Sequence, residues 1–221
     1  MPPLPDHLRY IVVEGVIGAG KSTLARMLAA QTDARLVLES FEDNPFLERF
    51  YEDPKRWAFQ TQLAFLASRF RQQKELGARD LFQTSTVADY SFDKDRIFAR
   101  VTLDGDEHVL YESLFTLMEA TVPVPDLVVY LRSSVDRLMR NVALRGRSYE
   151  AQMDPAYLAE LTEAYDRYFF HYSRSPLLVV NATEIDFVKE PAHFEQLVQA
   201  IRRTRGGTTY LNPPGTMELA F

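Results

Sequence analysis

Cysteine is absent from this sequence, and so are long apolar runs. Without cysteine the chain has no disulfide framework, no thiolate metal site and no thiolate nucleophile. No stretch approaches the roughly 20 apolar residues that cross a membrane. Residues 1–6 are rich in proline and lack the apolar core of a signal peptide. We therefore expect a cytoplasmic protein that has no membrane-bound segment.

An excess of positive charge is also absent. The 221 residues include 25 lysines and arginines against 31 acidic residues, which gives a net charge of −6. This balance argues against nucleic acid as a partner, although a local cluster of arginines can still hold phosphate groups. Hydrophobic residues make up 46% of the chain and aromatic residues 12%, as is typical of a globular protein with a sizeable core.

Five short apolar runs alternate with longer helical patterns. Each run is too uniformly apolar to be part of a solvated sheet, so each is expected to form a buried strand. The runs cover residues 10–13, 35–38, 84–88, 126–131 and 177–180. This alternation predicts the α/β class, with a five-stranded parallel sheet flanked by helices in three layers.

Prolines and glycines mark the expected ends of the helices. Asp53 and Asp154 each precede a proline, and an N-cap carboxylate followed by a first-turn proline begins a helix. Gly77 is expected to end the first of these helices, and Gly105 to break another. We expect one domain over residues 1–205, followed by a tail, 206–221, that is disordered or packs late.

The most specific motif is GVIGAGKS at residues 15–22, which fits G-x4-G-K-[ST] at every fixed position. Glycines let backbone N–H groups surround a phosphate, and the following helix adds N–H groups at its N-terminus. Lysine neutralises phosphate charge, and the serine hydroxyl can ligate Mg²⁺. The flanking strand and helix disfavour a turn that only links them. The predicted nucleoside triphosphate site comprises Gly15, Val16, Ile17, Gly18, Ala19, Gly20, Lys21, Ser22 and Thr23.

Two acidic residues follow expected strands, Glu39 after the second and Asp89 after the third. Parallel strands bring their carboxyl ends to one edge of the sheet, where ligands bind. Glu39 is a candidate general base for an acceptor hydroxyl. Asp89 is a candidate ligand for Mg²⁺, directly or through water. A solvated loop glutamate and an aspartate that caps a turn are the alternatives.

Gln62 and Arg69 lie seven residues apart in a helical stretch that is otherwise rich in Phe, Leu and Ala. This spacing places both side chains on one face of the helix. An amide and a guanidinium together can read the edge of a planar base. The alternative is that Arg69 faces solvent with Arg71.

Arginines gather at residues 135–149. Guanidinium groups suit the charge that spreads over a phosphoryl group during transfer. A helix followed by an Arg-Gly-Arg turn predicts a mobile lid, at about residues 141–153. A basic solvated helix face explains the first two of these arginines but not the last two. They are Arg137, Arg140, Arg145 and Arg147.

A phosphate loop alone does not separate kinases from other nucleotide-binding proteins. The chain has no N-K-x-D run that would read guanine, and a small acidic domain is a poor helicase. The acidic residues at the strand ends favour transfer of the terminal phosphoryl group to a small acceptor. A nucleoside monophosphate kinase of the thymidylate-kinase type and a non-catalytic P-loop switch remain the alternatives.

These residues together resemble the deoxynucleoside kinases, the family of deoxycytidine, deoxyguanosine and deoxyadenosine kinases. The resemblance extends from the phosphate loop to about Arg203. Its most specific stretch is YEDPKRW at residues 51–57, followed by FQTQ at 59–62 and Ser68-Arg69. The family implies an ATP- and Mg²⁺-dependent kinase of nucleotide salvage that phosphorylates the 5′-hydroxyl of a deoxyribonucleoside and forms a homodimer.

The resemblance also implies roles for individual residues. The implied catalytic residues are Glu39, as the general base for the 5′-hydroxyl, with Lys21, Arg145 and Arg147. Tyr51 and Glu150 would bind the 3′-hydroxyl, and Asp186 and Phe187 resemble the loop that covers the adenine of ATP. The substrate-binding residues are Glu39, Tyr51, Trp57, Gln62, Arg69, Asp89, Asp93 and Glu150.

The sequence departs from the family pattern after the third strand, where an acidic residue, an arginine and a serine are usual. Here residues 89–91 read D-Y-S, so the arginine is missing. Lys94 and Arg96 are alternative replacements for its charge. Asp93 and Asp95 are alternatives for the acid that would contact an amino group on the base.

The lid helix departs as well, because Asn141 stands where a further arginine is common. The departures concern the groups around the transferred phosphate and leave the reaction unchanged. Arg69 with a nearby aspartate favours a base that carries an exocyclic amino group, namely adenine, guanine or cytosine.

Overall fold

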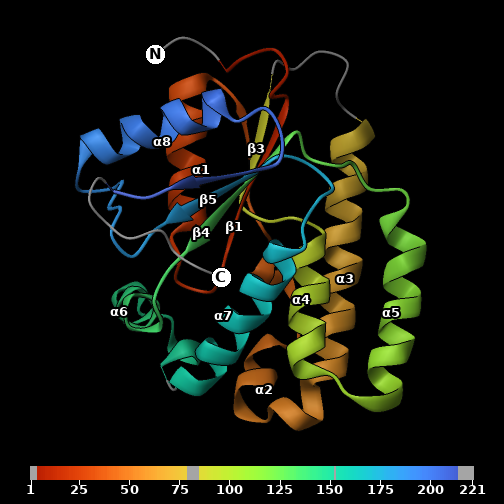
Figure 1. The fold of residues 1–221 in the computed structure, drawn as a ribbon. Helices are drawn as coiled ribbons and strands as arrows, with labels where there is room; N and C mark the ends of the chain where they lie inside the picture. Colours follow the sequence, from red (N-terminus) through yellow and green to blue (C-terminus); the bar gives the residue numbers. More distant parts are fainter. Residues whose placement is uncertain (1–3, 79–84, 152, 214–221) are drawn as a thin grey trace.

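A parallel sheet lies at the centre of the fold in this computed structural model, which describes residues 4–78, 85–151 and 153–213. Six strands pair in the order β2-β3-β1-β4-β5-β6 within these residues (Figure 1). They are β1 (Tyr10–Gly15), β2 (Arg35–Val37), β3 (Thr86–Ala88), β4 (Leu127–Arg132), β5 (Leu177–Asn181) and β6 (Thr208–Leu211). The predicted α/β class and parallel sheet are confirmed, with one strand more than expected.

Helices cover both faces of the sheet. Figure 1 shows α1 and α8 on one side, and α3, α4 and α5 together on the other. The helices are α1 (Lys21–Thr32), α2 (Leu47–Glu52), α3 (Pro54–Ala78), α4 (Asp93–Thr102), α5 (Gly105–Glu119), α6 (Val135–Arg145), α7 (Pro155–Phe170) and α8 (Pro191–Arg203). Two short 3-10 helices are η1 (Phe41–Asp43) and η2 (Ser148–Glu150). No helix in the described ranges is long and apolar enough to cross a membrane.

The predicted helix starts are present. The Asp53 carboxylate accepts a hydrogen bond from the backbone N–H of Arg56 at 3.3 Å, and Asp154 accepts one from Ala156 at 2.8 Å. Both carboxylates therefore cap the first turn of a helix that begins with proline. Helix α3 extends one residue beyond Gly77, and Gly105 is the first residue of α5.

The sixth strand lies in the segment that was expected to be a tail. Strand β6 pairs in parallel with β5, and three of its four residues are exposed. A short edge strand with polar residues has neither a uniform apolar run nor a helical period, so the pattern that found the other strands missed it. Thr84, the predicted start of the third strand, lies outside the described residues, and β3 begins at Thr86.

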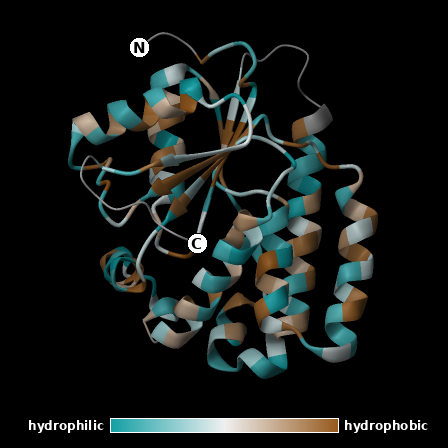
Figure 2. Cartoon of the chain, viewed as in Figure 1, coloured by the Kyte–Doolittle hydropathy of each residue, from teal (hydrophilic) through white to brown (hydrophobic). Residues whose placement is uncertain are grey.

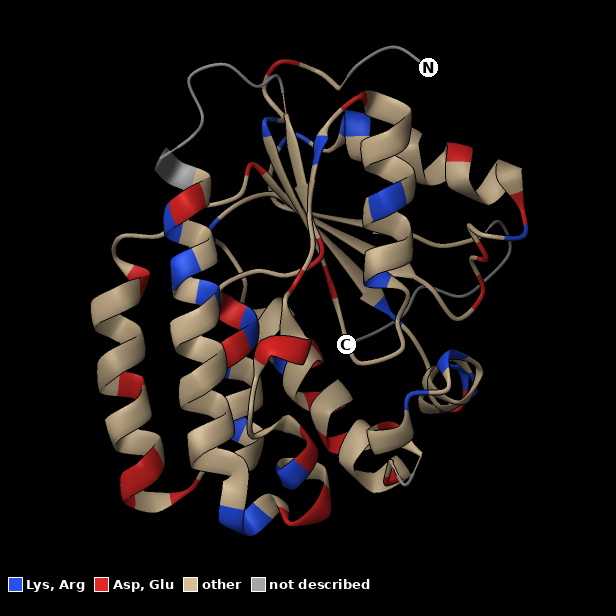
Figure 3. Cartoon of the chain, turned by 180° about the vertical axis from the view of Figure 1, so that it is seen from behind, with Lys and Arg blue, Asp and Glu red and all other residues tan. Residues whose placement is uncertain are grey.

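Hydrophobic residues concentrate in the sheet and along the inner faces of the helices (Figure 2). Every residue of β5 is buried, as is nearly all of β1 and β4. A second cluster fills the space between α3, α4 and α5, where Phe92 and Phe115 stack with ring centroids 4.8 Å apart. Charged residues lie mostly on the helices and loops (Figure 3). The few charged residues that are buried therefore need an explanation.

The strand register brings three acidic residues together. Ala88 pairs with Val12 on one side and with Val37 on the other. Glu14, Glu39 and Asp89 each follow this row by one or two residues along parallel strands. They therefore project from the same edge of the sheet, at the end where ligands of α/β proteins bind.

Candidate active site

The loop between β1 and α1 has the backbone of a phosphate cradle. Gly18 and Gly20 have φ angles of +84° and +94°, which side-chain-bearing residues rarely adopt. A Cβ on Gly18 would also lie 2.7 Å from the carbonyl oxygen of Leu138 in α6. Asn141 of the same helix donates a 2.8 Å hydrogen bond to the Gly18 carbonyl oxygen. The residue that replaces the usual lid arginine thus joins the lid helix to the phosphate loop.

Ser22 and Asp89 meet at the start of α1. The Ser22 hydroxyl donates a hydrogen bond to Oδ2 of Asp89, and Oδ1 of Asp89 accepts one from the backbone N–H of Glu39 at 2.8 Å. The Lys21 ammonium donates to the Val16 carbonyl oxygen at 3.1 Å. Burial, and then the charge of Lys94, lower the pKa of Lys21 to about 8. Asp89, at the end of β3, therefore links the segment after β2 to the start of α1.

Next to the phosphate loop lies a cavity with about 780 Å³ of empty space, part of it open to solvent. Aromatic residues such as Phe65, Phe98 and Tyr157 form one part of its wall, and polar residues form another. The predicted site residues that line it are Ile17, Lys21, Ser22, Glu39, Tyr51, Gln62, Arg69, Asp89, Arg145, Arg147 and Glu150.

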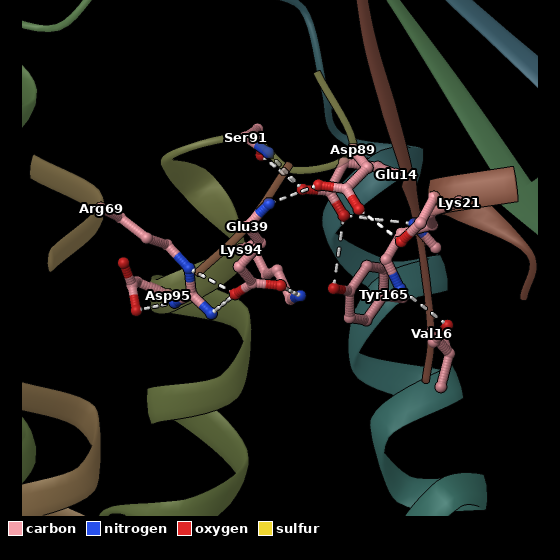
Figure 4. A network of polar contacts seen from close by, with 12 residues as sticks. Glu14, Val16, Lys21, Glu39, Arg69, Asp89, Ser91, Lys94, Asp95 and Tyr165 are labelled. Atoms are coloured by element: carbon pink, nitrogen blue, oxygen red, sulfur yellow. Dashed lines mark hydrogen bonds and ion pairs between the residues drawn. The ribbon is translucent and has the colours of Figure 1, made fainter. Parts of the chain in front are cut away.

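Glu39 is held by two cations inside this cavity. The Arg69 guanidinium contacts Oε1 of Glu39, with Nε at 2.9 Å, and the Lys94 ammonium contacts Oε2 (Figure 4). Burial by itself raises the pKa of a carboxyl group, but the charges of Arg69 and Lys94 outweigh burial. They hold the pKa of Glu39 well below its usual range, so Glu39 is ionised.

Asp95 contacts the same arginine from the other side (Figure 4). It is fully buried and does not line the cavity. Burial raises the pKa of Asp95 to about 7, because the charge of Arg69 does not fully compensate the loss of water. The Arg69 guanidinium thus contacts two carboxyl groups with different pKa values. The pKa of Glu39 is lowered, so Glu39 keeps its negative charge, whereas the pKa of Asp95 is raised.

Helices α3 and α4 form two polar contacts with matching spacing. Gln62 of α3 contacts Thr102 of α4, and Arg69 of α3 contacts Asp95 of α4. The two contacts are seven residues apart on each helix, and the residue numbers rise along α3 while they fall along α4. The Thr102 hydroxyl donates its proton to the Phe98 carbonyl oxygen at 2.9 Å, so it can only accept from Gln62. The amide nitrogen of Gln62 therefore faces Thr102, at 3.0 Å, and Oε1 has no hydrogen-bond partner among the described residues.

Residues of the predicted lid line the cavity from the side of α6. Gly146 ends α6 with a φ angle of +68°, and the chain turns back into η2. Arg145 forms an ion pair with Glu150 at 2.6 Å, and the Arg147 guanidinium lies 3.9 Å from the centroid of the Phe41 ring. Both arginines line the cavity, and their role as a mobile lid stays a prediction.

A second cavity lies on the other side of the phosphate loop. Asp186 and Phe187 line it together with Gly18, Gly20 and Thr23. Phe187 lies over the loop, because a Cβ on Gly20 would meet the Phe187 ring at 3.2 Å. Four residues line both cavities, so the two spaces meet at Lys21, Ser22, Arg145 and Arg147.

Two predicted substrate contacts do not lie at the cavity. Asp93 forms a 2.9 Å ion pair with Arg174. Residues two apart on a helix point in nearly opposite directions, so Asp93 points away from the interior into which Asp95 points. Trp57 does not line the cavity either. Its ring stacks on Phe46, with centroids 5.9 Å apart.

Glu14 is a buried charged residue behind the site that the sequence reasoning missed. Its carboxylate accepts hydrogen bonds from the N–H and hydroxyl of Ser91, at 2.6 and 2.9 Å, and it is fully buried at the end of β1. Burial raises its pKa, although the charges of Lys94 and Lys21 oppose this. A glutamate directly after an apolar strand run was a usable signal, since buried charges are rare without a partner.

The parallel sheet, the phosphate loop after its first strand and the adjoining cavity, lined by both acidic and basic side chains, are the features of a P-loop kinase. Residues 11–204 match the family described as deoxynucleoside kinase.

Curated relatives agree with this assignment. The deoxyguanosine kinase of Bacillus subtilis (strain 168) is 31% identical over 198 residues, which cover 87% of this chain and 96% of the relative. The deoxyadenosine kinase of Dictyostelium discoideum is 32% identical over 212 residues, with coverages of 93% and 84%. A solved structure of deoxyadenosine kinase from M. mycoides with bound dATP has a TM-score of 0.74 at 25% identity, with coverages of 86% and 97%. The chain therefore belongs to the deoxynucleoside kinase family and is an enzyme that phosphorylates deoxynucleosides.

Proposed function

We propose that the protein transfers the γ-phosphoryl group of ATP to the 5′-hydroxyl of a deoxyribonucleoside that carries an amino group on its base. The observation that carries this proposal is the junction of the two cavities at Lys21, Ser22, Arg145 and Arg147. A nucleoside in the cavity of Glu39 and a triphosphate on the loop would meet at these four side chains. The proposal also rests on relatives that are named deoxyguanosine kinase and deoxyadenosine/deoxycytidine kinase.

Glu39 is the proposed general base. It is ionised, lines the acceptor cavity and is fixed by Arg69 on Oε1. The 5′-oxygen forms a bond to the γ-phosphorus while the bond from that phosphorus to the bridging oxygen breaks, and the hydroxyl proton passes to Glu39. Lys21, Arg145 and Arg147 hold the phosphate charge in this step, as cations do in phosphoryl transfer.

Ser22 and Asp89 are the proposed protein ligands of Mg²⁺. Both offer hard oxygen atoms, and they already contact each other beside the phosphate loop. No group of three acidic or histidine side chains forms a metal site within the described part of the chain. That agrees with an ion that takes most of its ligands from phosphate and water. When bound, Mg²⁺ would neutralise charge on the triphosphate.

The preference for an amino-bearing base rests on Gln62, which lines the acceptor cavity. Oε1 of Gln62 is a buried acceptor without a partner among the described residues. Unpaired buried acceptors are costly, and donor groups on a bound base would satisfy them. An exocyclic amino group supplies two N–H donors, whereas the thymine edge supplies one N–H flanked by carbonyls. Deoxyadenosine, deoxyguanosine and deoxycytidine are therefore the proposed substrates.

A nucleoside monophosphate kinase would need free cations in the acceptor cavity for the phosphate of its substrate. Arg69 is instead paired with Glu39 and Asp95. A nucleoside acceptor fits this arrangement better, because its hydroxyl needs a base and no counter-charge. The homodimer implied by the resemblance stays a prediction.

The test is a coupled phosphorylation panel of the four deoxynucleosides, each with ATP and with GTP as donor. Products are identified as 5′-monophosphates by chromatography and mass spectrometry. Lys21→Ala is the control for background activity, because it removes phosphate neutralisation without changing the core. Thymidine as the best acceptor would contradict the proposed base preference. Faster turnover of deoxynucleoside monophosphates than of deoxynucleosides would contradict the proposed acceptor.

A further inference from the structure

Lys94 occupies a position that is unfavourable for a lysine apart from its ion pair with Glu39. It lies in the first turn of α4, and its side chain is only 8% exposed. A helix N-terminus carries a partial positive charge, so a lysine there is unfavourable, and burial adds a desolvation cost. Residues that break local rules in this way are concentrated at functional sites.

The partners of Lys94 connect it to the reaction centre. Its ammonium contacts Oε2 of Glu39 and lies 5.6 Å from the centroid of the Phe98 ring, and Lys94 lines the acceptor cavity together with Lys21. Its charge is the second largest cause, after burial, of the lowered pKa of Lys21. The two ammonium groups are therefore close enough to repel each other, and an anion between them would relieve that repulsion.

Neutralisation of Glu39 alone does not require Lys94. Arg69 already contacts Oε1 of Glu39 through two nitrogen atoms. Arg96, the other cation considered as a replacement for the missing arginine, does not line the cavity and pairs with Glu112 at 2.7 Å, with 43% of its side chain exposed. Lys94 is thus the surplus cation beside the phosphate loop.

We propose that Lys94 is a catalytic residue, whose ammonium moves from Oε2 of Glu39 to the transferred phosphoryl group and so couples arrival of the triphosphate to release of the general base. The proposal rests on the proposed function. Lys94 keeps its three protons throughout. The hydroxyl proton of the acceptor passes to the freed Oε2, the 5′-oxygen bonds to the γ-phosphorus, and the bridging oxygen leaves with the nucleoside diphosphate.

The test compares Lys94→Met with Lys94→Arg and with Arg96→Met as the matched control on the same helix. We expect Lys94→Met to lower kcat by about 10²–10³-fold, the scale of one lost transition-state donor, with little change in the dissociation constant of the deoxynucleoside. Lys94→Arg should recover most of the loss, and Arg96→Met should retain kcat within about threefold. Binding of ADP with aluminium fluoride, which mimics the transferred group, should weaken in Lys94→Met more than binding of ADP alone.

Three results would overturn the proposal. The first is a kcat in Lys94→Met within about threefold of wild type. The second is a loss of deoxynucleoside affinity and melting temperature in proportion to the loss of kcat, which would make Lys94 structural. The third is that Lys94→Met weakens the binding of ADP alone and the binding of ADP with aluminium fluoride by the same factor. If the wild type phosphorylates no nucleoside, the proposed function fails. The aluminium fluoride comparison then tests separately whether Lys94 contacts the transferred phosphoryl group.

Discussion

Arg69 is the cation that two buried carboxyl groups share, so its removal is expected to destabilise the protein. Its side chain is 4% exposed, against 10% for Glu39 and 0% for Asp95. Breaking a buried ion pair from one side costs about 3–5 kcal/mol, because the remaining charge keeps its desolvation cost without a partner. In a chain of this size each kcal/mol lowers Tm by about 2–4 °C, which predicts a fall of roughly 6–20 °C.

We expect Arg69→Met to lower the free energy of unfolding, measured by urea titration, by about 3–5 kcal/mol. Lys94 stays beside Glu39, so the cost falls mainly on Asp95. The double variant Arg69→Met/Asp95→Asn should therefore recover about 1–3 kcal/mol, the cost of one unpaired buried group. Arg71→Met, which removes an exposed arginine from the same helix, should change stability by less than about 0.5 kcal/mol. A loss below about 1 kcal/mol in Arg69→Met, or no recovery in the double variant, would refute this account of the charge network.

Three further predictions follow from the same contacts. Glu39→Gln should lower kcat by about 10²-fold or more while deoxynucleoside binding is retained, because an amide cannot accept the proton; steady-state kinetics and calorimetry separate the two. Gly18→Ala should weaken ATP binding, because its Cβ would lie 2.7 Å from the Leu138 carbonyl oxygen and Gly18 has a φ angle of +84°; the nucleotide dissociation constant measures this. The free energy of unfolding should fall as pH rises from about 4 to 7, because folding raises the pKa of Asp95 from 3.8 to about 7 and the folded state retains a proton that the unfolded chain has lost. Asp95→Asn should lack this contribution when urea titrations at pH 5 and pH 7 are compared.

The architecture was accessible from the sequence because burial on both faces produces uniform apolar runs. All five predicted runs correspond to strands, and both Asp-Pro helix starts are present. Strand β6 escaped because it is an exposed edge with polar residues. Its pairing with β5 depends on contacts distant in sequence, which no local pattern contains.

Sequence patterns located the candidate residues where a residue type and a strand end coincide. Glu39 and Asp89, which follow strands, lie at the cavity, and their catalytic roles stay predictions. Asp93 does not line the cavity, because the direction of a side chain in the first turn of α4 depends on where that helix begins. A shift of two residues reverses the side of the helix that a carboxylate faces. Local spacing did not determine this starting point.

The division of charge between Glu39 and Asp95 explains how one arginine can support both binding and chemistry. Pairs of titratable groups whose pKa values are pushed apart often mark the acid and the base of an active site. Here Glu39 retains its negative charge because Arg69 and also Lys94 contact its carboxylate, whereas Asp95 contacts only the shared arginine among the described residues. A carboxylate held by two cations is a weak base, so proton transfer to Glu39 requires that one of them leaves. Asp95 contacts Arg69 from the side away from Glu39, and Lys94 lines the cavity next to the phosphate loop. In the proposed mechanism, Lys94 is therefore the cation whose departure frees the base.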